Sequence, residues 1–200
     1  MEAKRKMKKC KLLQGKDYDR IEEIANDLIE DLGLTLFPVN CFEVAFLLGI
    51  EIKKYSDIPE EDREFVISKY EDGYSSKIID KYVIYYNEAL DRNRIKFTIW
   101  HEIAHIQLGH LEEDCLGNYL RLEEEANHFA SYIMAPLVFI HNLGLTNIFD
   151  IAEVCQISFE HAWNVLNRYY NTFRYASIRN IVLNGRIGRL LTYVPKEVVA

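Results

Sequence analysis

The sequence lacks any apolar run of about 20 residues, the length that an α-helix needs to cross a bilayer. Its basic N-terminus is not followed by an apolar segment, so we expect no secretory signal. No two of its 4 cysteines form a Cys-x-x-Cys pair, so neither a thiolate zinc site nor a redox motif is indicated. These absences predict a cytoplasmic protein with reduced cysteines at Cys10, Cys41, Cys115 and Cys155.

An excess of positive charge is also missing. The chain carries 24 Lys and Arg against 31 Asp and Glu, a net charge of −7, which disfavours general binding to a nucleic-acid backbone. The exception is a basic run of Lys4, Arg5, Lys6, Lys8, Lys9 and Lys11. Such a run is typical of a solvated terminus. We therefore predict a flexible basic tail over residues 1–16, and no direct contact with nucleic acid or membrane.

The spacing of apolar residues predicts an α+β fold that is mostly helical. Helices are expected over residues 17–33, 38–48, 91–110, 119–134, 137–143, 147–155 and 158–171. Short strands are expected over 50–55, 65–70 and 81–87, in a small three-stranded antiparallel sheet. Residues 174–183 fit a strand or a helix, and 190–194 a short strand. We expect one body over 17–145 and a helical appendage over 146–200 packed on it.

The predicted helix 91–110 contains His101-Glu102-Ile103-Ala104-His105. Residues four apart project from the same helix face, so both imidazoles can bind one zinc ion. Glu102 is placed to take a proton from a water on the metal without binding the metal itself. A chance pair of histidines is disfavoured, because burying these polar groups in an apolar segment without a task is costly. The motif predicts a zinc-dependent peptidase, although the same donors also suit manganese or iron.

A catalytic zinc site needs a third protein ligand and an open fourth position. Leu108 and Leu111 exclude the metzincin arrangement, which has glycine and histidine at these positions. The predicted helix 119–134 instead offers Glu123, Glu124 and Glu125. Its apolar stripe consists of Leu122, Ala126, Phe129, Ala130 and Ile133. Glu123 and Glu125 border this stripe and Glu124 points to solvent, so geometry leaves Glu123 and Glu125 as alternatives.

Two segments between residues 81 and 136 resemble the ImmA/IrrE family of bacterial metallopeptidases. The first is Phe97-Thr98-Ile99-Trp100-His101-Glu102-Ile103-Ala104-His105, with Arg94 ahead of it. The second is Glu123-Glu124-Glu125-Ala126-Asn127-His128-Phe129-Ala130, followed by Ile133-Met134-Ala135-Pro136. The family usually has Leu-Leu-Met-Pro in this closing segment. Ala135 departs from that pattern, which concerns packing rather than catalysis.

The resemblance implies a zinc metallopeptidase domain over residues 17–145, with one zinc ion on His101, His105 and Glu123. Asn127, one turn after Glu123, would support the site from outside the ligand set. Family members cleave a helix-turn-helix transcriptional repressor and so switch on genes of mobile elements or stress responses. The resemblance therefore implies such a repressor as the protein partner. Our own hypothesis is that the substrate binds as an extended strand along the sheet edge.

Two other function classes stay open. The same fold could act without catalysis as an antitoxin-like protein that binds a regulator. Residues 147–170 also resemble a helix-turn-helix, with Ser158 as the N-cap of the second helix. That helix carries Glu160 and His161, and its only basic residue is Arg168, so we favour packing or partner docking over DNA binding.

Three further expectations concern histidines and tyrosines near the motif. His110 is expected to interact with the helix dipole rather than to take part in the site. His128 is expected to be exposed on the outer helix face. The residue that stabilises an oxyanion is sought among Tyr82, Tyr85 and Tyr86, the tyrosines nearest to the presumed edge strand.

Overall fold

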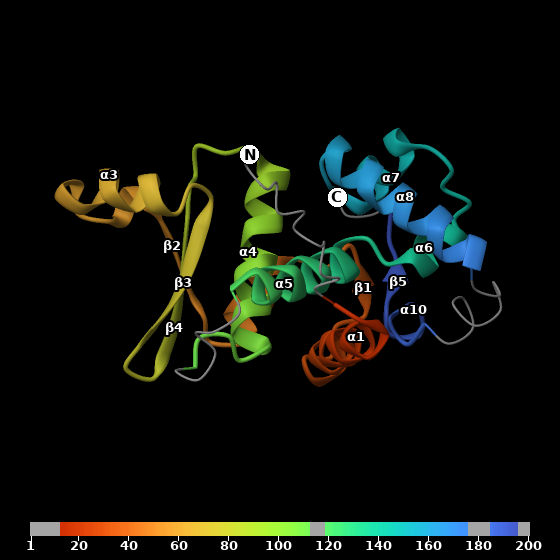
Figure 1. The fold of residues 1–200 in the computed structure, drawn as a ribbon, viewed down its shortest axis with the longest axis horizontal. Coiled ribbons are helices and arrows are strands. Elements are labelled where there is room, and N and C mark those ends of the chain that lie inside the picture. Colours follow the sequence, from red (N-terminus) through yellow and green to blue (C-terminus); the bar gives the residue numbers. More distant parts are fainter. Residues whose placement is uncertain (1–12, 113–118, 176–184, 196–200) are drawn as a thin grey trace, which may run out of the picture.

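A computed structural model describes residues 13–112, 119–175 and 185–195. Most of the predicted basic tail and of segment 174–183 therefore lies outside the described residues. In Figure 1, helix α4 (Arg92–Gln107) stands in the centre, with a small sheet on one side and the C-terminal helices on the other. No helix in the described ranges combines the length and the apolar character needed to cross a membrane.

Most of the described chain is helical, as predicted. Besides α4, the helices are α1 (Gly15–Asp31), α2 (Cys41–Leu47), α3 (Glu60–Lys69), α5 (Tyr119–Met134), α6 (Leu137–Asn142), α7 (Ile148–Cys155), α8 (Phe159–Tyr175) and α10 (Ile187–Leu190). The residues at their starts explain several of these boundaries. Asp91 caps α4 by accepting from the backbone of Asn93 and Arg94, and Asn147 caps α7 in the same way.

The sheet has three strands in the order β2 (Glu51–Lys54), β4 (Lys81–Tyr86) and β3 (Gly73–Ile78). Strand β3 is antiparallel to β4, but β2 is parallel to it, so the predicted antiparallel order holds for one pair only. Strand β4 lies in the middle and is not an edge. A separate parallel pair, β1 (Leu36–Phe37) with β5 (Thr192–Tyr193), connects the N-terminal part of the described chain to its C-terminal part.

The strand predicted over residues 65–70 is wrong, because this segment belongs to helix α3. Three acidic residues in the first turn of α3 stabilise this helix, because negative charge interacts favourably with the positive end of the helix dipole. No residue of α3 is buried, and Phe65 and Ile67 are exposed. The strand that takes its place in the sheet is β3, over a segment for which no strand was predicted. A Cβ atom at Gly73 would lie 2.8 Å from the backbone oxygen of Tyr85, so only glycine fits there.

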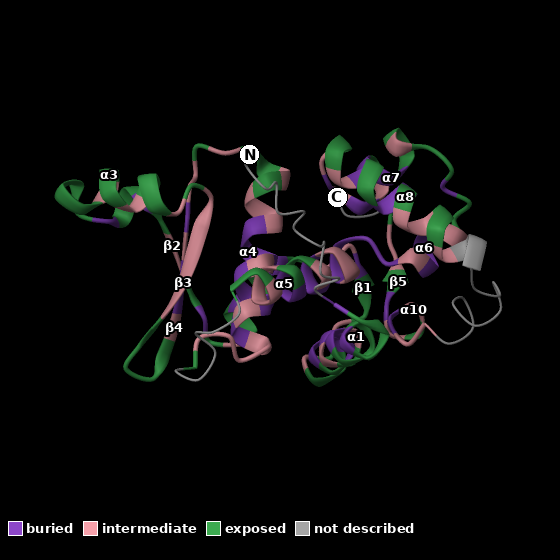
Figure 2. Ribbon diagram, in the orientation of Figure 1, coloured by how far each residue is buried: buried purple, intermediate pink, exposed green. Residues whose placement is uncertain are grey.

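Helices α4 and α5 pack against each other and both contribute buried residues to the hydrophobic core. The buried side of α4 includes Ile99 and Ile103, and that of α5 includes Phe129 and Ile133 (Figure 2). The fully buried alanines Ala104, Ala126 and Ala130 add little bulk on these faces. Buried side chains of α7 and α8 belong to the same hydrophobic cluster. The core therefore supports α4 and α5 from several sides.

Candidate metal centre

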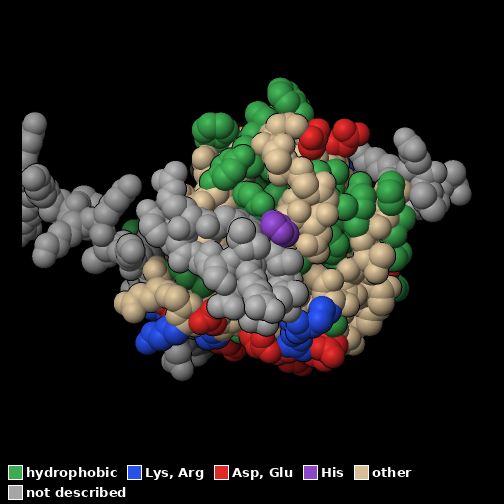
Figure 3. All heavy atoms as spheres, turned by 90° about the vertical axis from the view of Figure 1, so that its right-hand side faces the viewer, with side chains coloured by type: hydrophobic (Ala, Val, Ile, Leu, Met, Phe, Trp, Pro, Cys, Tyr) green, Lys and Arg blue, Asp and Glu red, His purple; other side chains and the backbone are tan. Residues whose placement is uncertain are grey.

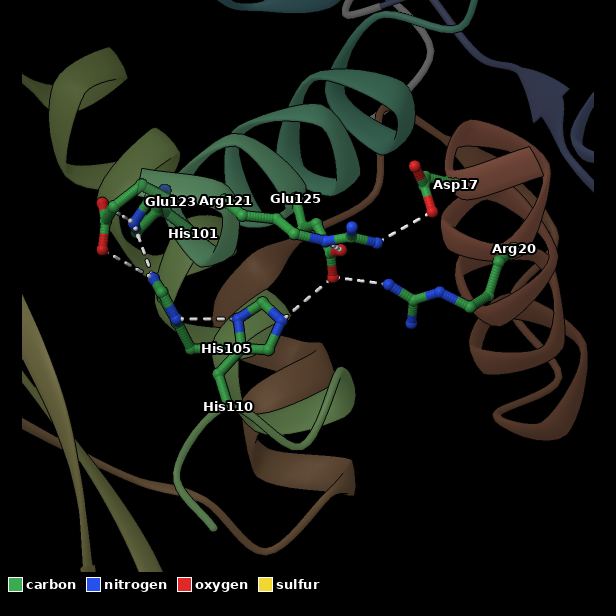
Figure 4. Close-up of polar contacts among 8 residues, drawn as sticks. All are labelled: Asp17, Arg20, His101, His105, His110, Arg121, Glu123 and Glu125. Atoms are coloured by element: carbon green, nitrogen blue, oxygen red, sulfur yellow. Dashed lines mark hydrogen bonds and ion pairs between the residues drawn. The ribbon is translucent and has the colours of Figure 1, made fainter. Parts of the chain in front are cut away.

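Three of the predicted site residues come together between α4 and α5. His101 and His105 project from α4, and Glu123 projects toward them from the first turns of α5 (Figure 4). The Nε2 atoms of the two histidines are 3.0 Å apart. Carboxylate oxygens of Glu123 lie 3.3 Å from His101 Nε2 and 3.5 Å from His105 Nε2. One donor atom from each residue thus points to a common centre.

These distances suit a tetrahedral metal. Ligands at about 2.0 to 2.2 Å from zinc are separated from one another by about 3.3 to 3.6 Å along the edges of a tetrahedron. The three donor pairs, at 3.0, 3.3 and 3.5 Å, lie within about 0.3 Å of that range. Two imidazoles and a carboxylate are also a usual donor set of catalytic zinc sites. The residues therefore fit a zinc ion with one open position.

The outer nitrogens of both histidines have partners, as expected of metal ligands. His101 Nδ1 lies 3.1 Å from the side-chain oxygen of Asn127, and His105 Nδ1 lies 3.0 Å from His110 Nδ1. When the outer nitrogen carries the proton, the inner nitrogen keeps a lone pair for a metal. Asn127, which was expected to support the site from outside the ligand set, thus contacts the outer nitrogen of His101.

Glu102 follows His101 in the sequence, is buried, and is not one of the three converging donors. The hydroxyl of Ser75, on strand β3, donates a hydrogen bond of 2.6 Å to Glu102 Oε2. Strand β3 thus holds the carboxylate that the motif placed next to the metal ligands. Ser75 was missed because no strand was predicted over residues 73–78.

The charges of the cluster support one another. Burial by itself lowers the pKa of His101, but the hydrogen bond and charge of Glu123 and the charge of Glu102 outweigh it, so the pKa is raised. Hydrogen bonds from His101 and His105 hold the pKa of Glu123 well below its usual range. Glu123 is therefore an ionised carboxylate, the form that binds metal.

Glu125, the other glutamate that geometry had left open, points away from this centre. Its side chain is buried and is held by Arg20 of α1 at 2.5 Å and by Arg121 at 2.9 Å. The third partner is His110, whose Nε2 lies 3.3 Å from Glu125 Oε2. Glu124 is exposed, as predicted. The structure thus separates the three neighbouring glutamates into different environments.

Two expectations about nearby histidines are corrected. The His110 side chain is only 3% exposed and contacts His105, so it belongs to the surroundings of the site. The His128 side chain is mostly buried and pairs with Glu22. The choice of an oxyanion-stabilising tyrosine stays a prediction; the charge of Glu123 raises the pKa of Tyr119, whose side chain is exposed. No described hydrogen bond or ion pair links Tyr82, Tyr85 or Tyr86 to the three donors.

A hollow of about 1280 Å³ lies beside the cluster, on the side of Asn127 and Phe97. Its lining is rich in acids, namely Asp19, Glu22, Asp72, Asp91, Glu124 and Glu160. None of the three converging donor residues lines this hollow. The three donors therefore do not open into this hollow.

Comparison with known families agrees with this geometry. Residues 55–167, more than half of the chain, match the sequence model of Peptidase M78, described as the IrrE N-terminal-like domain. The matched segment contains Glu102 and all three converging donor residues. No curated protein matches the chain.

Proposed function

The chain belongs to the IrrE N-terminal-like peptidase family, and from this premise we propose that it is a zinc-dependent endopeptidase. The observation that carries the proposal is the convergence of His101, His105 and Glu123 at the spacing of a zinc tetrahedron. In the proposed site these three residues hold the ion and Glu102 is the general base. Manganese or iron would be held by the same donors.

Zinc, when bound, supplies a water of lowered pKa and polarises the carbonyl that is attacked. The chain's own residues then move the proton. Glu102 takes it from the attacking water and later passes it to the leaving amine. Ser75 keeps the Glu102 carboxylate in one orientation through the 2.6 Å hydrogen bond. The donor to the developing oxyanion is sought among Tyr82, Tyr85, Tyr86 and Tyr119, and the charge of Glu123 acts on Tyr119.

The proposed substrate binds as an extended strand on β3. Strand β3 pairs with β4 on one side, and no described strand covers its other edge. An added strand there would gain main-chain hydrogen bonds and would pass the Ser75–Glu102 pair. The family resemblance supports a helix-turn-helix repressor as the protein that supplies this strand.

The test compares cleavage by the wild type and by Glu102→Gln, using the helix-turn-helix regulator encoded nearest to this protein. We expect a loss of about 10²- to 10⁴-fold in rate for loss of the general base. Zinc binding should persist, because Glu102 is not among the three donors. Glu124→Gln is the matched control, since it makes the same chemical change at an exposed site and should cleave normally.

A second function, regulator binding without catalysis, is favoured by the surface of the C-terminal helices. Four aromatic side chains are exposed there, namely Phe149, Phe159, Trp163 and Tyr170. Hydrophobic side chains gather on the upper part of the face drawn in Figure 3. If the regulator binds but survives equally with the wild type and with Glu102→Gln, this second function replaces the first.

A further inference from the structure

A chain of polar contacts leads from the metal-facing histidine His105 to helix α1. It runs from His105 to His110 on the turn after α4, then to Glu125 on α5, and ends at Arg20 on α1 (Figure 4). We propose that His110 and Glu125 are positioning residues for His105, and that α1 takes part in the metal site through Arg20. This inference rests on the proposed zinc site.

The proton positions along this chain follow from the chemistry of its last acceptor. An ionised carboxylate can only accept, so Glu125 requires the proton of His110 to sit on Nε2. The Nδ1 atom of a neutral His110 is then an acceptor, and it lies 3.0 Å from His105 Nδ1. His105 must therefore donate from Nδ1. Its Nε2 is left with the lone pair that a metal needs.

Glu125 can serve as this fixed acceptor because neighbouring arginines hold its side chain in place and neutralise its negative charge. Its side chain is 5% exposed, and an unpaired carboxylate would be costly at that depth. Arg20 and Arg121 each donate to one of its two oxygens. Arg121 also donates to Asp17 on α1 at 2.8 Å. Two links from α1 thus keep Glu125 charged and facing His110.

Helix α1 lies outside the segment that matches the peptidase family. The match begins at residue 55, whereas α1 covers Gly15–Asp31. A shortened protein limited to the matched segment would lack Arg20 and Asp17. Glu125 would then keep one guanidinium partner, and that partner would lack its own anchor. The metal site of this chain therefore extends beyond the family domain.

The first experiment measures zinc affinity by competition with a chromogenic chelator, using the full-length protein. His110→Phe keeps a planar ring in the buried position but removes both nitrogens. Loss of a partner behind a metal ligand typically weakens metal binding by about 10- to 100-fold, and we expect this range for the zinc Kd. Circular dichroism of the metal-free variant shows whether the fold is kept.

The second experiment removes the far end of the chain of contacts. Arg20→Met deletes a side chain that is 44% exposed, so this variant should fold. We expect it to weaken zinc binding less than His110→Phe does, because Arg121 remains on Glu125. Arg186→Met is the matched control: Arg186 also ties down α1, through Glu23, Asp27 and Glu30, but does not reach Glu125. Its zinc affinity should equal that of the wild type.

A third measurement detects the central hydrogen bond directly. In zinc-bound protein labelled with ¹⁵N-histidine, an N–H···N bond produces a scalar coupling between the two nitrogens that share the proton. We expect this coupling between His105 Nδ1 and His110 Nδ1 in the wild type and in Arg186→Met. The coupling shows whether the two nitrogens share a proton, and the zinc Kd shows whether that hydrogen bond supports the metal site.

The outcomes separate the two proposals. A wild type that does not bind zinc contradicts the proposed function itself. A wild type that binds zinc, while His110→Phe and Arg20→Met bind it equally well, overturns the positioning role. The same holds if the nitrogen coupling is absent from the zinc-bound wild type. If His110→Phe does not fold, Arg20→Met and the coupling decide the question.

Discussion

Two helix pairs of this protein use buried polar side chains in different ways. Between α4 and α5, the imidazoles of two histidines and the carboxylate of Glu123 converge on one point. The outer nitrogen of each of these histidines contacts a further polar side chain. In α7 and α8, the buried side chains are mainly apolar, and aromatic residues lie outside. Burying converging polar groups between α4 and α5 costs free energy unless they bind a ligand such as a metal ion. The apolar side chains of α7 and α8 need only to pack against the rest of the core.

The polar residues of α8 serve this packing. Arg168 donates to the backbone oxygens of Ser131 and Ala135, at the end of α5, where a cation also suits the helix dipole. His161 contacts Ser131 and meets the ring of Phe97 edge-on. Arg168 is the only Lys or Arg with a described side chain on these two helices. The described cation of these two helices is therefore used in packing against α5.

The largest effect expected to distinguish the α4–α5 pair from the α7–α8 pair is stabilisation of the fold by zinc. Binding to the folded chain alone, at a free zinc concentration about 1,000 times the Kd, raises the free energy of unfolding by about 4 kcal/mol. We expect His105→Ala to abolish this gain, because it removes one of three donors. Thermal unfolding with zinc or with a chelator measures the effect.

His161→Gln is the control from the other helix pair, because it replaces a histidine that faces no metal donor. Its stabilisation by zinc should match that of the wild type. If His105→Ala were stabilised as much as the wild type, zinc would bind elsewhere and the contrast between the helix pairs would disappear.

The next effect concerns pH and the α7–α8 pair. Burial, aided by the charge of Arg168, lowers the pKa of His161 to about 4. The unfolded chain takes up this proton near pH 6.5, as an unperturbed histidine does. Stability from this residue is therefore fully present above about pH 6.5 and is lost as the pH falls toward 4.

Between pH 7 and pH 5 this loss amounts to roughly 2 kcal/mol. Denaturant unfolding of metal-free protein at both pH values measures it, and His161→Gln should lose less stability than the wild type by about that amount. An equal pH dependence in both proteins would mean that His161 is protonated in the folded state, which contradicts a purely packed α8.

The elements that were predicted well are those whose local signals agree with one another. The predicted helix 119–134 has the bounds of α5, because its apolar stripe is regular and Pro136 follows it. Around residues 60–78 the local signals conflict. Phe65 and Ile67 look like strand residues, yet they are exposed on α3, and β3 contains Ser75, Ser76 and Lys77. Its place is determined by pairing with β4, which no local pattern shows.

The site divides in the same way. The four-residue spacing of His101 and His105 on one helix was sufficient to predict that both project from the same face. The choice between Glu123 and Glu125 was open, because both border the apolar stripe, and only the family resemblance favoured Glu123. The partners of Glu125 decide the matter, and Arg20 lies 105 residues away in sequence. Contacts over such a distance depend on how α1 packs against α5.

The smallest expected effect tests the exposed side of α8. The Trp163 residue is 56% exposed, so Trp163→Ser should change the free energy of unfolding by no more than about 0.5 kcal/mol. Zinc affinity should also be unchanged, because no metal donor lies on this helix. Denaturant unfolding and chelator competition measure both quantities.

The same variant then separates packing from docking. If α7 and α8 only complete the core, Trp163→Ser should cleave the intact regulator and a short peptide across its cleavage site as the wild type does. A raised KM for the intact regulator, with an unchanged KM for the peptide, would assign the aromatic face to substrate docking. A loss of several kcal/mol in stability would instead show that Trp163 is held by the core. The two helix pairs would then differ less than described above, because the stability of α7 and α8 would also depend strongly on the contacts of individual side chains.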